Sequence, residues 1–180
     1  VGCAVGDALG SAFEGVSELE PEYENEFSGK WTDDTHMMIG VAESLVKNKG
    51  FDGRDMAQTF IKHYDEEPWR GYASGPPQVF KWIKSGIRWD KASSRLFGGE
   101  GSLGNGGAMR VAPIGLLCFD NPERLRTVAY GSAQITHAHE IGKEGAAIQA
   151  YAVSLAVTLA RSHSSDEFDP HSFLNDLKNF

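Results

Sequence analysis

Two adjacent aspartates stand directly before an amphipathic run, in the stretch Thr32-Asp33-Asp34-Thr35, and they limit how this chain can fold. Neighbouring carboxylates repel each other, so a fold that buries both raises at least one pKa unless a cation lies between them. Carboxylate and hydroxyl oxygens are the ligands that Mg²⁺ and Ca²⁺ prefer. The same residues also suit a helix start, where Thr32 or Asp33 caps the first turn and acids favour its positive end. Locally, a helix cap and a metal site are both open.

The composition is that of an ordinary globular protein with an acidic surface. Its 180 residues are enough for one domain with a core, and the net charge of −8 without a basic stripe argues against direct nucleic-acid binding. We find no charged-then-apolar leader and no apolar run of membrane-spanning length, so we expect no membrane association. The expected location is intracellular, in the cytoplasm, nucleus or mitochondrion of a eukaryote. Cys3 and Cys118 form no C-x-x-C pair, which favours a reducing compartment with both thiols buried.

Apolar residues recur at helical spacing through most of the chain. Segment 1–12 alternates like a strand, but its apolar spacing favours a helix whose small residues pack closely on neighbouring helices. The long segment 141–160 is rich in alanine and is predicted to be buried on most sides. We find no convincing series of alternating strands. The sequence therefore predicts an all-α bundle of seven or eight helices in one domain, 1–180, with helices over 1–12, 33–49, 54–65, 78–84, 108–117, 122–135, 141–160 and 171–180.

Half of the twelve residues in segment 96–107 are glycine. Glycine permits positive φ angles and lets backbone N–H groups approach a ligand closely. A helix N-terminus directly behind such a loop would favour an anion. The loop is not of the Walker type, because no Gly-Lys-Ser/Thr follows. A flexible surface loop is the alternative, and the apolar run that follows makes it less convincing.

Segment 136–140 interrupts two predicted helices and contains two histidines. His137 and His139 could bind a metal with Glu140, but a zinc site usually needs three or four convergent ligands, and no H-E-x-x-H or cysteine pair supplies them. Hydrogen bonding of His137 to a ligand at the helix junction is the better interpretation. A capping Thr136 with incidental histidines remains the alternative.

Taken together, these motifs resemble the ADP-ribosylglycohydrolase family. Each motif alone is weak, and their order and spacing over nearly the whole chain make the set specific. Two further features, Arg70-Gly71-Tyr72 and Phe97, resemble the ADP-ribosylhydrolase 3 subgroup, which removes ADP-ribose from serine and degrades poly(ADP-ribose). The family motifs are Gly6-Asp7-Ala8-Leu9-Gly10-Ser11-Ala12-Phe13-Glu14, Trp31-Thr32-Asp33-Asp34-Thr35, Gly101-Ser102-Leu103-Gly104-Asn105-Gly106-Gly107-Ala108-Met109-Arg110 and Ile135-Thr136-His137-Ala138.

The resemblance implies an orthogonal all-α bundle with a two-Mg²⁺ centre, acting as a monomer on ADP-ribosylated proteins or poly(ADP-ribose). Thr32, Asp33 and Asp34 match the family's first metal-ligand cluster. Glu14 matches a glutamate that contacts the metal centre and assists proton transfer, and it would sit on a flap that continues into the acidic segment 18–26. The implied catalytic residues are therefore Glu14, Asp33 and Asp34. The implied ligand-binding residues are Gly71, Ser74, Phe97, Gly101, Ser102, Leu103, Gly104, Asn105 and His137, with Phe97 and His137 at the adenosine end.

Two departures from the family pattern shape the expectation. Leu103 stands where the subgroup has an aromatic residue that stacks on adenine, and the family's second metal cluster, Asp-x-Asp-Thr, is absent from these 180 residues. We therefore expect the N-terminal portion of a family member, truncated at both ends. The leading hypothesis is a Mg²⁺-dependent hydrolase of ADP-ribosyl groups. The alternative is a non-catalytic ADP-ribose-binding or structural protein, since the same fold serves as a lens crystallin in jellyfish. A downstream Asp-x-Asp-Thr would favour the enzyme.

Overall fold

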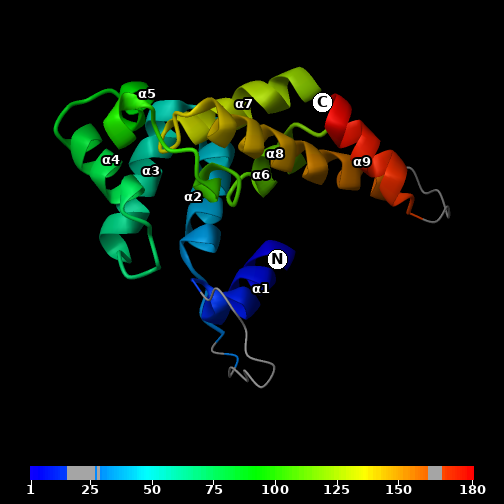
Figure 1. Cartoon of the computed structure of the whole chain (residues 1–180), viewed down its shortest axis with the longest axis horizontal. Helices are drawn as coiled ribbons and strands as arrows, with labels where there is room; N and C mark the ends of the chain where they lie inside the picture. Colours follow the sequence, from blue (N-terminus) through cyan, green and yellow to red (C-terminus); the bar gives the residue numbers. More distant parts are fainter. Residues whose placement is uncertain (16–26, 28, 162–167) are drawn as a thin grey trace.

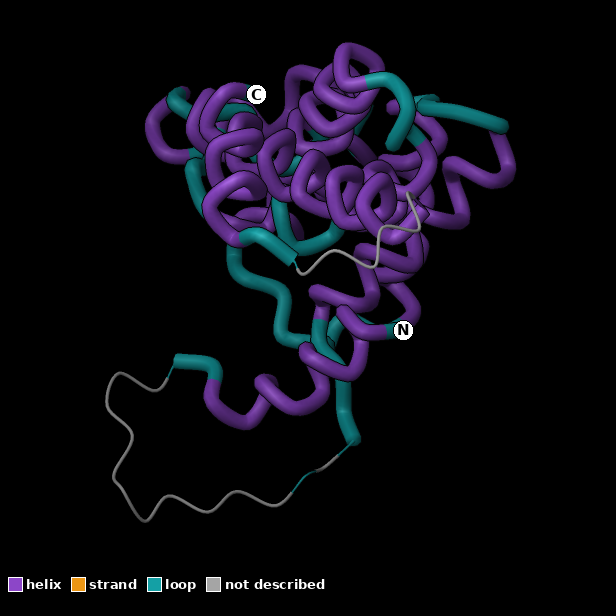
Figure 2. The backbone as a smooth tube through the Cα atoms, turned by 90° about the vertical axis from the view of Figure 1, so that its right-hand side faces the viewer, coloured by secondary structure: helices purple, strands orange, loops and turns teal. Residues whose placement is uncertain are grey.

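The computed structural model describes residues 1–15, 27, 29–161 and 168–180, which are helices and loops without a strand (Figures 1 and 2). The predicted all-α class is confirmed, and the predicted acidic flap over 18–26 lies outside the described residues. No helix among them is long and apolar enough to cross a bilayer. The α-helices are α1 (Gly2–Gly10), α2 (Asp33–Asn48), α3 (Gly53–Glu66), α4 (Gly75–Lys84), α5 (Trp89–Ala92), α6 (Ala112–Leu117), α7 (Pro122–Gln134), α8 (Glu140–Arg161) and α9 (Pro170–Asn179). Four short 3₁₀ helices, η1 (Ser11–Phe13), η2 (Ser93–Arg95), η3 (Phe97–Gly99) and η4 (Asn105–Gly107), complete the set.

The core forms where α2 packs on α3 and where α6 and α7 pack on α8 (Figure 1). Burial of apolar side chains gains roughly 25 cal/mol of free energy per Å² of surface removed from water. This gain is the main driving force for the packing. The inward face of α3 contains Met56, Ala57 and Phe60, as its spacing predicts. The buried face of α2 contains Met37, Val41 and Leu45, whereas the apolar Val46 is 78% exposed.

Four of the described helices begin at a side chain that accepts a hydrogen bond from a first-turn amide, and one of them is α9, where Asp169 accepts from His171 N. Thr32 accepts from Asp34 N, Asp52 from Asp55 N, and Asn121 from Arg124 N. Each bond satisfies a backbone donor that has no partner inside the helix. The helix-cap role predicted for Thr32 is confirmed.

Proline sets two helix starts that periodicity alone misplaces. Helix α4 begins at Gly75 rather than 78, with Pro76 and Pro77 in its first turn. Helix α6 begins at Ala112 rather than 108, with Pro113 in its first turn. Proline lacks an N–H and is tolerated only where that donor has no partner inside the helix. The predicted helix directly behind the glycine-rich loop is therefore wrong, and a turn over 108–111 separates them.

Helix α1 is not tightly packed, contrary to prediction. It lies beside the first turn of α2 and away from the α7–α8 pair (Figure 1). A Cβ placed on Gly2, Gly6 or Gly10 would find no atom within 4 Å, and Ala8 is the helix's one buried residue. Cys3 is exposed, so its predicted burial is wrong, whereas Cys118 is buried.

Helix α8 is buried along one face only, so the prediction that it is buried on most sides is wrong. Its buried residues are small and follow one stripe, Gly142, Ala146, Ala147, Ala150 and Ser154. The opposite side carries large apolar side chains in solvent, with Ile141 63% and Leu159 48% exposed. Alanine-rich composition therefore indicated close packing of one face on α7 and α6, and not full burial.

Candidate functional site

Asp7 of α1 fixes the start of α2. Its carboxylate accepts hydrogen bonds from Thr32 N at 2.9 and 3.1 Å, from Thr32 Oγ1 at 2.8 Å and from Thr35 N at 3.1 Å. Burial alone would raise the pKa of Asp7, but the hydrogen bonds from Thr35 and Thr32 hold it below its usual value. The sequence reasoning gave Asp7 no role. Its signal was a lone charge in a helix of otherwise small and apolar residues.

Asp33 and Asp34 lie at the first turn of α2 in strongly negative surroundings. Asp33 is only 9% exposed, and burial, followed by the nearby Asp34 carboxylate, raises its pKa to about 6. Burial also raises the pKa of Asp34, and the carboxylates of Asp7 and Glu14 add to that shift. The cluster therefore carries charge that its surroundings do not neutralise.

The loop between α3 and α4 brings the backbone of Gly71 against this cluster. Arg70 anchors the loop, because its Nε donates to Glu67 at 2.6 Å and its carbonyl accepts from Asp33 N at 2.7 Å. Gly71 has φ +94°, and a Cβ there would lie 3.6 Å from Asp33 Oδ1 and 4.0 Å from Glu14 Oε2. Glycine is required here by the backbone angle, and its lack of a side chain leaves the acids open.

A hollow of about 290 Å³, the central hollow, brings most of the predicted site residues together. The acids come from the segment after η1 and from α2, and the remaining walls come from the α3–α4 loop, the glycine-rich loop and the α7–α8 junction. Its lining comprises Glu14, Asp33, Asp34, Met37, Gly71, Ala73, Ser74, Gly75, Pro76, Phe97, Ser102, Gly104, Asn105, Gly106, Met109 and His137. Residues far apart in sequence thus share one cavity, while their individual roles stay predictions.

Three predicted site residues lie outside the central hollow. The Thr32 hydroxyl is engaged with Asp7 and with the α2 amide. Gly101 is buried, and a Cβ on it would meet Ala138 at 2.8 Å. Leu103 is 60% exposed.

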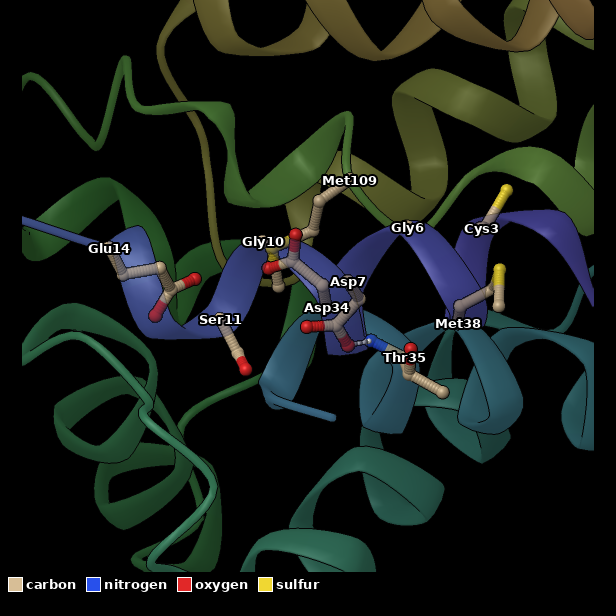
Figure 3. Close-up of a pocket in the computed structure, with 10 residues that line it drawn as sticks. All are labelled: Cys3, Gly6, Asp7, Gly10, Ser11, Glu14, Asp34, Thr35, Met38 and Met109. Carbon is tan, nitrogen blue, oxygen red and sulfur yellow. Dashed lines mark hydrogen bonds between the residues drawn. The ribbon is translucent and has the colours of Figure 1, made fainter. Parts of the chain in front are cut away.

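A second hollow of about 370 Å³ lies on the α1 side of the acids (Figure 3). Figure 3 shows Asp7, Glu14 and Asp34 around it, each from a different element, with Met109 reaching in from the turn before α6. The buried Thr35 Oγ1, also on its lining, has no hydrogen-bond partner in the structure. The acids are therefore reachable from two sides.

The glycine-rich loop packs closely on the protein's own α7–α8 junction. A Cβ on Gly106 would lie 2.6 Å from His137 Cε1, closer than real contacts allow. Gly101 has φ +79°, and Phe97 adopts a positive φ of 51° while 65% exposed. A left-handed angle at a bulky residue is uncommon and clusters at ligand-binding segments. Part of the glycine content thus serves this internal contact, beyond the predicted approach to a ligand.

His137 is buried and neutral at physiological pH. Its Nδ1 lies 2.8 Å from the Thr136 hydroxyl. Burial, with a contribution from the positive charge of Arg110, lowers its pKa to about 3. A neutral imidazole keeps one donor and one acceptor nitrogen, which suits hydrogen bonding to a ligand in the central hollow. His139 and Glu140 instead contact Ile141 N and Lys143, so the three do not gather as a zinc site.

Arg110 is a fully buried cation that the sequence reasoning did not single out. Its guanidinium donates to the Ser132 carbonyl at 2.6 Å, lies 4.6 Å over the Phe60 ring, and has an unpaired Nε. Burial lowers its pKa, and arginine nonetheless stays protonated at neutral pH. The signal was a basic residue immediately before an apolar run. Its charge partly offsets the negative potential around Asp33.

The acid cluster fits a hard divalent cation in part. The donors are oxygen atoms, and burial together with neighbouring carboxylates raises the pKa of Asp33 and of Asp34, a cost that a cation would relieve. Within the described part of the chain, however, no three His, Cys, Asp or Glu side chains form a group that could hold a metal. The residues present therefore suit Mg²⁺ held by one or two carboxylates and completed by water or substrate oxygens.

Comparison with known proteins decides the family. The model of the ADP-ribosylglycohydrolase family matches residues 1–178. The chain belongs to the ADP-ribosylglycohydrolase family. It is 39% identical over 183 residues to ADP-ribosylhydrolase ARH3 of Danio rerio, covering 94% of this chain and 49% of that protein. Identity to ADP-ribosylhydrolase ARH3 of Homo sapiens is 37%, over 93% of this chain and 50% of that protein.

A more distant relative shows the breadth of this ADP-ribosylglycohydrolase resemblance. ADP-ribosyl-[dinitrogen reductase] glycohydrolase of Rhodospirillum rubrum is 30% identical over 78% of this chain and 50% of that protein. The chain spans about half the length of the curated relatives it matches. The resemblance to this family that the motifs predicted is confirmed.

Proposed function

We propose that the protein is a hydrolase that releases ADP-ribose from serine-linked ADP-ribosyl proteins and from related conjugates or polymer. The observation that carries this proposal is the central hollow, where Glu14, Asp33 and Asp34 meet the glycine-rich loop and His137. Family membership and the ADP-ribosylhydrolase relatives support the class of substrate. The serine linkage follows from the relation to the ARH3 group and is part of the proposal.

The chain's own residues supply binding and proton transfer in this proposal. Ser102 and Asn105 offer hydrogen-bonding groups for the diphosphate and riboses, and neutral His137 borders the adenosine end. Gly71 gives backbone access to the acids without a side chain in the way. Glu14, on the exposed segment after η1, is placed to move a proton near the glycosidic bond, the role of carboxylates in glycoside hydrolysis.

The proposed cofactor is Mg²⁺, with two ions at the complete centre. Asp33 and Asp34 are the residues of this chain that would hold it, and Thr32 and Glu14 lie beside them. When bound, Mg²⁺ orients ribose hydroxyls, polarises the glycosidic bond and lowers the pKa of water. The chain contains no Asp-x-Asp-Thr, so the second ligand cluster would come from outside these 180 residues.

Release of ADP-ribose from a serine-linked ADP-ribosyl peptide, in Mg²⁺, tests the proposal in the full-length protein. Glu14→Gln and Asp34→Asn should each lower kcat about hundredfold or more, because each removes a carboxylate from the reacting centre. Glu66→Gln is the matched control, since that exposed carboxylate pairs among the described residues with Lys62 alone, at 3.8 Å, and it should retain wild-type turnover. A protein that binds ADP-ribose but releases none would support the non-catalytic alternative instead.

A further inference from the structure

A third hollow, of about 580 Å³, opens beside the acid cluster, and no residue of the glycine-rich loop lines it. We call it the tryptophan hollow, after Trp31 and Trp69 on its lining, where they are joined by Ser11, Lys30, Arg70 and Gly71. Its volume falls in the range of ligand pockets, roughly 300–1,000 Å³. Of its lining residues, Gly71 belongs to the predicted ligand-binding set and Thr32 to the predicted metal ligands.

Gly71 lines both the tryptophan hollow and the central hollow. A Cβ added to Gly71 would approach Asp33 and Glu14, so these acids border the backbone that the two hollows share. When a bond is broken at these acids, the two groups that it joined lie on opposite sides of them. If ADP-ribose occupies the central hollow, the group to which it is linked extends toward the tryptophan hollow.

We propose that the tryptophan hollow binds the polypeptide on either side of the modified side chain, an inference that rests on the proposed hydrolase function. The hollow is thus the acceptor half of the substrate site. Specificity for a protein, over a free amino acid carrying ADP-ribose, arises there. The central hollow recognises the nucleotide that all such substrates share.

The Arg70 side chain in the wall of this hollow is held by three contacts. The Arg70 guanidinium lies 3.4 Å over the Trp31 ring, donates to the Trp31 carbonyl at 3.0 Å and donates to Glu67 at 2.6 Å. The Arg70 guanidinium is therefore already engaged and is not free to hold the pyrophosphate of a second ADP-ribose unit. A polypeptide brings no such charge, so this chemistry favours a peptide over the next unit of a polymer.

Trp69 supplies the free contact surface. Its side chain is 71% exposed, and none of the hydrogen bonds or ring contacts found among the described residues involves it. An exposed indole offers a large apolar face and one N–H donor, the features enriched where proteins bind peptides and other proteins. Because nothing else holds it, Trp69 can be changed without disturbing the acids.

Two substrates that share the nucleotide and differ in the acceptor test the inference. They are free ADP-ribosyl-serine and the same serine within a short peptide, assayed with the full-length protein. Trp69→Ala should raise KM for the peptide about tenfold, leave kcat unchanged, and change kcat/KM for ADP-ribosyl-serine less than about twofold. Trp69→Phe should restore most of the peptide affinity. Val46→Ala, at a 78% exposed position of α2, should match wild type on both substrates.

The other outcomes contradict the inference in distinguishable ways. Equal losses on both substrates would place Trp69 in nucleotide binding, and no loss would remove it from the site. A loss confined to poly(ADP-ribose) would assign the hollow to the polymer. If the wild-type protein releases ADP-ribose from neither serine substrate, the proposed function itself fails, and this inference fails with it.

Discussion

At the scale of single residues, Asp7 joins two elements that are otherwise loosely packed. Its carboxylate satisfies two backbone amides and a hydroxyl at the start of α2, and it does so from α1, which buries only Ala8. The position of Glu14 depends on the same link, because Glu14 follows directly after α1 and η1. Asp7 thus connects the fold to the geometry of the acid cluster.

Replacing Asp7 by alanine should lower the free energy of unfolding by about 2 kcal/mol at pH 7, since partly buried donors lose a charged acceptor. The pKa of Asp7 is lowered, so this contribution is present above the usual aspartate pKa and is lost as pH falls below it. Denaturant unfolding at pH 7 and pH 3 measures both values. Asp65→Asn, which breaks an exposed pair with Lys84, should cost less than about 1 kcal/mol. Equal effects of the two variants would contradict the role given to Asp7.

His137 should resist protonation through the physiological range. Its pKa is lowered from 6.5 to about 3, so its neutral form stabilises the fold fully above pH 6.5. That stability is lost as pH falls from 6.5 toward 3, by about 2 kcal/mol at pH 5. In His137→Gln, the decrease in unfolding free energy between pH 7.5 and 5 should therefore be smaller by about that amount. An NMR titration of the His137 ring with a midpoint near 6.5 would contradict the burial that we describe.

At the scale of elements, periodicity and caps predicted most helices, and contacts between distant segments explain what they missed. The starts of α2, α3 and α7 follow from Thr32, Asp52 and Asn121, which act within one turn. The burial of α1 and of α8 depends on which helices pack against them. The spacing of apolar residues in the sequence does not reveal these neighbours. The family resemblance predicted one site for the motif residues, and most of them line the central hollow. By contrast, the acceptors of Asp7 and the burial of Arg110 depend on tertiary structure alone.

Two glycines with opposite surroundings, Gly106 in the glycine-rich loop and Gly145 in α8, test the packing of the loop. Gly106→Ala would place a Cβ 2.6 Å from the buried His137 ring, so we expect a loss of about 1–3 kcal/mol in stability and weaker ADP-ribose binding. Gly145→Ala, inside α8 with no atom within 4 Å, should gain up to about 1 kcal/mol and leave binding unchanged. Thermal unfolding and calorimetric titration with ADP-ribose measure both effects. Tolerance of alanine at Gly106 would show that the loop does not pack on His137.

At the scale of the whole molecule, the buried carboxylate of Asp33 carries an electrostatic cost that the proposed Mg²⁺ would relieve. Helix caps and Asp7 satisfy the backbone at the start of α2, so the Asp33 carboxylate is not needed for that purpose. Burial and neighbouring acids raise its pKa to about 6, which means that its charge costs stability at neutral pH. The proposed metal-binding role of Asp33 and the stability of the fold would therefore place opposite demands on this residue.

Thermal unfolding of Asp33→Asn in the full-length protein, with and without Mg²⁺, tests this claim most directly. Without metal, the variant should be more stable than wild type by about 1–3 kcal/mol at pH 7.5, because a buried charge is removed while the shape is kept. Added Mg²⁺ should raise the melting temperature of the wild type and leave that of the variant nearly unchanged. A variant that melts lower than wild type yet keeps the full Mg²⁺ shift would contradict the account, because Asp33 would then support the helix and not the metal.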